Sequence, residues 1–225
     1  MVGVIRSPRA LFTSLIARPR WVGVLMVSLA LAAGCGIAFM RTAVGRQALV
    51  DQWERTALAF GQEVSNERYA EFSRLSEHGA GYAVASALAS GPLLTFAMAA
   101  LILVVFNWRA EARRTYAQVL AIVAHGGLIL ALRQVVATPL NYSRETLASP
   151  TTLSLLFPMF DEASPAARFF GAIDMFVVWW VIVLAIGVSL LYRRPARSTA
   201  FAFMGAYIGV AVLLTIAMAL SGGTV

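Results

Sequence analysis

The chain has 225 residues, of which 60% are apolar and only 13% are charged, and its mean hydropathy is +0.76. A soluble domain is nearer half apolar and a quarter charged, so this composition excludes a water-facing globule and indicates a polytopic membrane protein. The net charge of +7 comes from arginine alone, because the chain has no lysine, which excludes P-loop and Schiff-base lysines. A single cysteine, Cys35, excludes an intramolecular disulfide and a cysteine-cluster metal site.

Residues 1–20 carry a short amphipathic pattern. Ser7 and Pro8 are typical of the start of a helix. The apolar residues that follow fall on one helical face, namely Leu11, Phe12, Leu15 and Ile16. We predict a cytoplasmic helix that lies in the membrane interface, and the alternative is a disordered basic leader.

Five apolar runs are long enough to cross about 30 Å of hydrocarbon. They cover residues 21–40, 81–106, 116–136, 169–192 and 199–220. The motif "LAAGC", which ends at Cys35, loosely resembles a lipoprotein cleavage site, but the apolar run continues past it, so we predict an uncleaved span. The predicted fold is therefore an all-α integral membrane bundle, with residues 21–225 as a five-span membrane domain.

Two connections between the spans are polar. In segment 41–80, Asp51 and Arg55 form an i,i+4 pair, and Ser65 or Asn66 can cap a second helix that Gly79 ends. We predict two amphipathic helices here. Segment 137–167 contains four prolines and an apolar stretch too short to cross, which predicts an interfacial or dipping segment.

The arginines predict the orientation. Three segments, namely 1–20, 107–115 and 193–198, contain most of them and would lie on one side of the membrane. Nearly all acidic residues fall in the connections on the other side. The positive-inside rule therefore places the N-terminus in the cytoplasm and the C-terminus outside, with a bacterial cytoplasmic membrane as the expected location.

Three ionisable residues fall within predicted spans, namely His125, Arg133 and Asp174. Arg133 lies near the end of the third span and Asp174 lies a few residues inside the start of the fourth, so both are predicted near the outer interface, where they can pair. In the alternative, Arg133 snorkels to the headgroups and Asp174 is stabilised by the helix dipole. His125 precedes two glycines and could line a proton or ligand site; the alternative is a neutral imidazole bonded to a backbone carbonyl or a hydroxyl.

Small residues recur at helical spacing in three spans and predict close helix packing. The stripes are Ser28, Ala32 and Gly36; Ala83, Ala87 and Gly91; and Gly205 and Gly209. The sequence contains no HExxH, GxSxG, Gly-rich phosphate loop or EF-hand pattern. We therefore expect no catalytic residues, no cofactor and no bound metal.

Several stretches together resemble the bacterial branch of the Yip domain family, the Ypt/Rab-GTPase-interacting proteins. They are "SPRALFTSLIARPRW", "GPLL", "FNWRAEARRTYAQVLAIVAH" and "FFGAIDMFVVWWVIVLAIGVSLLYRR", and the resemblance covers about residues 7–217. It implies a five-span bundle with a cytoplasmic N-terminus and no catalytic residues. The chain lacks the long acidic or proline-rich leader of many eukaryotic relatives, which weakens the link to Rab GTPases.

Two functions of different class follow. The first is a non-enzymatic membrane protein that scaffolds or shapes the membrane or recruits partners; its partners would be the lipid bilayer and other proteins or further copies of itself. The second is a small-solute or ion transporter or channel with His125, Arg133 and Asp174 along a polar path, although no inverted repeat is visible. Neither function involves nucleic acid.

Overall fold

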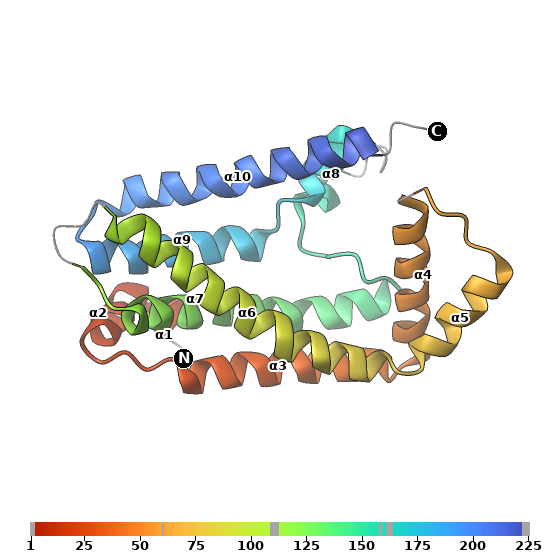
Figure 1. The fold of residues 1–225 in the computed structure, drawn as a ribbon, viewed down its shortest axis with the longest axis horizontal. Helices are drawn as coiled ribbons and strands as arrows, with labels where there is room; N and C mark the ends of the chain where they lie inside the picture. Colours follow the sequence, from red (N-terminus) through yellow and green to blue (C-terminus); the bar gives the residue numbers. More distant parts are fainter. Residues whose placement is uncertain (1–2, 60, 109–112, 158, 161–163, 222–225) are drawn as a thin grey trace. The chain divides into compact units, whose positions relative to one another are not determined.

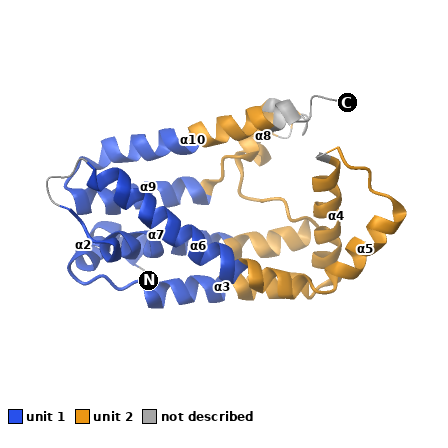
Figure 2. Ribbon diagram, in the orientation of Figure 1, with its two compact units in different colours: residues 1–31, 87–133, 176–207 blue, residues 32–86, 134–175, 208–225 orange. Residues whose placement is uncertain are grey.

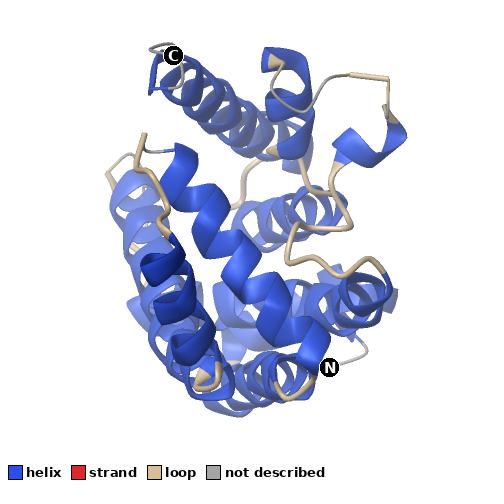
Figure 3. Ribbon diagram, turned by 90° about the vertical axis from the view of Figure 1, so that its right-hand side faces the viewer, coloured by secondary structure: helices blue, strands red, loops and turns tan. Residues whose placement is uncertain are grey.

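The computed structural model describes residues 3–59, 61–108, 113–157, 159–160 and 164–221. Across these ranges the secondary structure is helical, with one isolated bridge and no strand (Figures 1 and 3). The prediction of an all-α protein is therefore confirmed. The elements are α1 (Gly3–Arg6), α2 (Pro8–Ala17), α3 (Val22–Met40), α4 (Ala43–Ala59), α5 (Asn66–Ser76), α6 (Gly79–Asn107), α7 (Tyr116–Ser143), η1 (Leu153–Leu156), α8 (Pro165–Gly171), α9 (Met175–Tyr192) and α10 (Ala196–Ser221).

Five helices are long and apolar enough to cross a membrane, namely α3, α6, α7, α9 and α10. Their bounds differ from the predicted spans mainly at two places. α7 continues through Pro139 to Ser143, beyond the predicted end at residue 136. α9 begins at Met175 rather than at Phe169, because residues 172–174 leave the helix and the preceding residues form the separate helix α8.

The chain divides into two compact units, shown in different colours in Figure 2. Unit 1 comprises residues 1–31, 87–133 and 176–207, and unit 2 comprises residues 32–86, 134–175 and 208–225. Each unit contains parts of several spans. α7 and α9 are the most buried of the five: 56% and 44% of their apolar windows are buried, against 11% for α6 and 6% for α10.

The core of unit 1 is formed by α2, α6, α7 and α9. Its fully buried side chains include Phe12, Ile122, Ile129, Val188 and Leu191. A Cβ on Gly187 would lie 2.5 Å from Ile122 and 3.2 Å from the ring of Phe12, so only glycine lets these elements approach so closely.

This core changes the interpretation of the N-terminal helix. α2 forms as predicted, but Phe12 is fully buried, Leu15 is 6% exposed, and both belong to the core of unit 1. Leu11 and Ile16 pack against the same cluster. Phe12 and Leu15 therefore pack on the bundle rather than face lipid, and the position of this helix in the membrane interface stays a prediction.

In unit 2, the two predicted amphipathic helices are present as α4 and α5. Their polar side is linked by Gln47, whose amide donates to Asp51 at 2.7 Å and to the hydroxyl of Tyr69 at 2.9 Å. On the apolar side, the ring of Trp53 lies 5.8 Å from that of Phe72. Ser65 caps α5 by accepting a hydrogen bond from the backbone of Arg68, as the sequence indicated.

Small residues bring α3 and α6 together within each unit. In unit 2, a Cβ on Gly36 would lie 2.8 Å from the Cβ of Ala83. In unit 1, a Cβ on Gly91 would lie 2.8 Å from the side chain of Leu29. The predicted packing role of these two stripes is confirmed. At Gly205 and Gly209 on α10, an added Cβ would meet nothing within 4 Å among the described residues, so that pair serves no such contact.

Candidate functional site

Asp174 is the most buried acidic residue that the structure describes, with 4% of its surface exposed. It occupies the position immediately before α9, not a position inside the span. Its Oδ2 accepts a hydrogen bond from the Thr151 hydroxyl at 2.6 Å and another from the Ser149 hydroxyl at 3.0 Å. The two hydroxyls thus satisfy one oxygen of a buried carboxyl group at the start of α9.

Backbone hydrogen bonds also join the loop of Thr151 to the residues around Asp174. Residues 151–153 and 173–175 form an isolated antiparallel bridge, in which Leu153 N donates to Ile173 O at 2.9 Å and Met175 N donates to Thr151 O at 3.0 Å. The chain therefore leaves the helical path before Asp174 in order to pair with the loop that supplies the hydroxyls. Sequence analysis did not single out Ser149 and Thr151, although the run "SPTT" is rich in the small hydroxyl residues that such a site needs.

His125 lies on α7 and is half-buried. Its Nδ1 is 2.8 Å from the carbonyl oxygen of Ala121, one turn earlier. A carbonyl only accepts, so Nδ1 carries the proton of this hydrogen bond. The alternative interpretation of His125 is an imidazole bonded to a backbone carbonyl or a hydroxyl, and this hydrogen bond to Ala121 is of that kind.

Beside His125, α7 faces Trp180 of α9 across a glycine. A Cβ on Gly126 would lie 3.5 Å from both Cδ1 and Nε1 of the indole. This Nε1 is buried and has no hydrogen-bond partner among the described residues. Gly126 therefore provides space for a large side chain that carries an unsatisfied polar atom.

Arg133 is a half-buried residue further along α7. It belongs to unit 1, whereas Asp174 belongs to unit 2. The structure thus unites Asp174 with Ser149 and Thr151, while the pairing of Arg133 with Asp174 remains a prediction.

A second polar arrangement, which sequence analysis missed, lies at the end of α6. The side chain of Asn107 bonds to both the backbone nitrogen and the carbonyl of Arg114, each at 3.1 Å, and thereby ties the end of α6 to the start of α7. The hydroxyl of Tyr192 donates to Asn107 Oδ1 at 3.0 Å, which adds the end of α9. Across the described residues, no group of three or more His, Cys, Asp or Glu side chains could hold a metal ion.

The five apolar helices and the buried polar groups at their ends define a multi-pass α-helical integral membrane protein. The family model of the Yip1 domain matches residues 2–219, nearly the whole chain, and the protein belongs to this family. The predicted family is therefore confirmed. No curated protein and no solved structure matches the chain.

Proposed function

We propose that the protein is a non-enzymatic scaffold of the bilayer, one that shapes the membrane or recruits partners to it. The observation that supports this proposal is that the polar groups within and directly before the spans bond to nearby parts of the chain. The carboxylate of Asp174 accepts hydrogen bonds from Ser149 and Thr151, and His125 bonds to its own helix. Polar groups that bond within the protein in this way favour a structural role over a role in lining a path for solutes.

Reconstitution into liposomes tests this function. We expect the purified protein to change the diameter or the shape of vesicles, seen by electron cryomicroscopy, in proportion to the protein-to-lipid ratio. Fluxes of protons and small ions, followed with entrapped dyes, should equal those of empty vesicles. A flux that exceeds this background and disappears in His125→Phe would overturn the proposal.

One observation supports a second candidate, a small-solute or ion transporter or channel. The buried indole nitrogen of Trp180 has no described acceptor and lies beside Gly126, the neighbour of His125. A transported solute could supply the acceptor that the indole lacks. The flux experiment above distinguishes this candidate from the scaffold.

We also propose a bacterial cytoplasmic membrane as the location, with the N-terminus in the cytoplasm and the C-terminus outside. The support is the arginine distribution over segments 1–20, 107–115 and 193–198, combined with five candidate spans, an odd number. A partner on the cytoplasmic side would meet these short basic segments.

Reporter fusions test the orientation. A cytoplasmic fluorescent reporter should be active when fused after Arg197, and an exported phosphatase reporter should be active when fused to the C-terminus, because the fifth span separates the two points. The reciprocal fusions should be silent. An exported reporter that is active after Arg197 contradicts the orientation.

A further inference from the structure

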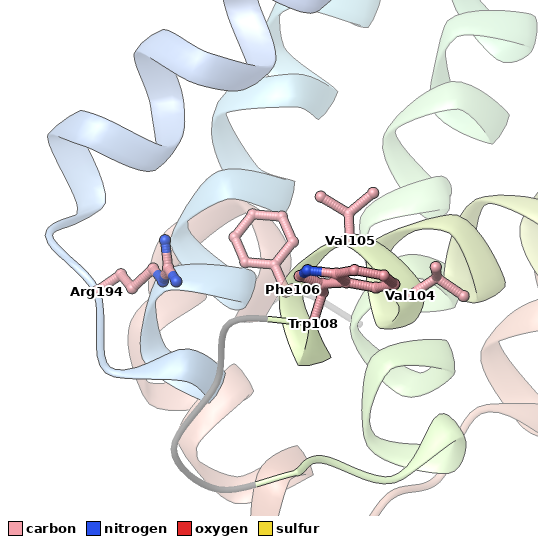
Figure 4. Close-up of a pocket in the computed structure, with 5 residues that line it drawn as sticks. All are labelled: Val104, Val105, Phe106, Trp108 and Arg194. Carbon is pink, nitrogen blue, oxygen red and sulfur yellow. The ribbon is translucent and has the colours of Figure 1, made fainter.

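One end of unit 1 contains a hollow of about 430 Å³ that the site described above does not use. It is lined by Val104, Val105, Phe106, Trp108 and Arg194 (Figure 4). The first three belong to the last turn of α6, and Arg194 belongs to the short connection between α9 and α10. The volume is within the range of small-molecule sites in proteins, about 300–1,000 Å³.

The floor of this hollow is formed by Phe106, which contacts other aromatic rings and Arg194. The ring of Phe106 lies 5.2 Å from that of Tyr192 and 5.8 Å, edge-on, from that of Phe203. Figure 4 shows Arg194 reaching toward Phe106, and its guanidinium carbon is 5.7 Å from the centre of that ring. The Arg194 backbone nitrogen also donates to Ser189 O at 2.9 Å, so both ends of this residue are positioned.

The wall beside this floor is apolar and outward-facing. Val104 is 63% exposed, Val105 is 56% exposed and Trp108 is 85% exposed. The two valines belong to the last turn of the second candidate span, and Trp108 follows this span directly. Tryptophan is enriched where spans reach the membrane–water interface. A ligand of this wall must itself be apolar over the length of the last helical turn.

The charge beside the wall is positive. Arg193, Arg194 and Arg197 are exposed, and the segment 193–200 contains no acidic residue. A guanidinium presents a planar fork of donors that matches a phosphate group, and its stacking on Phe106 holds this fork in place. Basic residues next to a span also attract anionic lipids from the surrounding bilayer.

From this juxtaposition we propose that the hollow is a binding site for one anionic phospholipid, with its phosphate on Arg194 and the start of an acyl chain along Val104, Val105 and Trp108. Inorganic phosphate shares the charge but leaves the apolar wall uncovered, so the whole lipid is the ligand. The proposal requires membrane insertion only, and it is independent of the scaffold function.

Native mass spectrometry of the full chain tests the site. The protein, stripped of lipid in detergent, is titrated with phosphatidylglycerol, with phosphatidylcholine and with inorganic phosphate. We expect one phosphatidylglycerol to bind before any other and about tenfold more tightly than phosphatidylcholine, a difference of about 1.4 kcal/mol. Inorganic phosphate at matched concentration should neither bind detectably nor displace the lipid.

Two variants of equal charge make the test specific. Arg194→Gln should weaken this first phosphatidylglycerol about tenfold. Arg197→Gln is the matched control, since Arg197 stacks on Phe201 at 5.6 Å and does not line the hollow, and it should bind like the parent. Trp108→Ala should weaken phosphatidylglycerol and phosphatidylcholine alike, because it shortens the apolar wall.

The result that overturns the proposal is an equal loss in the two arginine variants, which would mean that general positive charge attracts the lipid. Equal binding of the two lipids by the parent overturns it as well, as does competition by inorganic phosphate. Thermal melting of each variant in the same detergent confirms that it is folded; all substituted side chains are exposed, so the melting temperatures should match that of the parent.

Discussion

Replacing Phe12 with alanine should lower the free energy of unfolding by about 3 kcal/mol, since a fully buried aromatic ring would leave a cavity in the core of unit 1. The ring also lies against Gly187 of α9, so its loss should loosen the contact of α2 with the bundle. Reversible unfolding in mixed detergent micelles, titrated with a denaturing detergent, measures this loss.

Ile5→Ala is the matched control, because Ile5 lies in the same N-terminal segment and is 50% exposed. Its effect should stay below about 1 kcal/mol. If residues 3–17 were held only by lipid, the Phe12→Ala variant and the parent would have the same free energy of unfolding in micelles. A parent-like unfolding curve for Phe12→Ala would therefore contradict the core position of this residue.

Replacing Asp174 with leucine should cost about 3 kcal/mol of folding free energy, because the buried hydroxyl of Thr151 and the half-buried hydroxyl of Ser149 would lose their hydrogen bonds to this carboxylate. Thr151→Val, which removes the shorter of the two hydrogen bonds, should cost about 1–2 kcal/mol. The double variant should be less destabilised than the sum, with a coupling energy of about 1–3 kcal/mol, measured by the same unfolding titration. Additive losses would mean that the Thr151 hydroxyl and the Asp174 carboxylate contribute to stability independently of each other.

A second cycle, with Arg133→Leu in place of Thr151→Val, tests the proposed ion pair. If Arg133 and Asp174 are paired, each single leucine variant strands a charge, and the double variant should be more stable than the worse single one. Leu140→Ala is a suitable control on the same helix, since Leu140 is exposed and uncharged, and it should not couple to Asp174→Leu. The two cycles together separate the hydroxyl partners of Asp174 from the arginine.

The five spans could be predicted from sequence because the requirement is local. A helix satisfies its own backbone in hydrocarbon, so an apolar run of sufficient length identifies the span without reference to its neighbours. Glycine and alanine at helical spacing likewise predicted the close approach of α3 and α6, which Gly36 and Gly91 confirm. The family resemblance, carried by short motifs in fixed order, was also present in the sequence alone.

The start of the fourth span required the tertiary structure. "FFGAIDMF" is apolar enough to continue a helix, and the break before Asp174 arises from the bridge to residues 151–153, which are distant in sequence. A hydropathy profile depends only on residues that are neighbours in the sequence, so it cannot detect such a pairing. The hydroxyl partners of Asp174 were missed for the same reason, since nothing near Asp174 in the chain indicates which loop returns to it.

The sequence by itself thus determined that the chain is an all-α membrane protein, where its apolar helices run and to which family it belongs, because length, hydropathy and motif order are properties of contiguous residues. The tertiary structure decided what each polar or amphipathic group faces. Phe12 and Leu15 have the spacing of a lipid-facing helix, yet they complete a protein core. An apolar face has the same pattern in either surrounding, since lipid tails and buried side chains are equally apolar, and only the position of the neighbouring helices distinguishes the two.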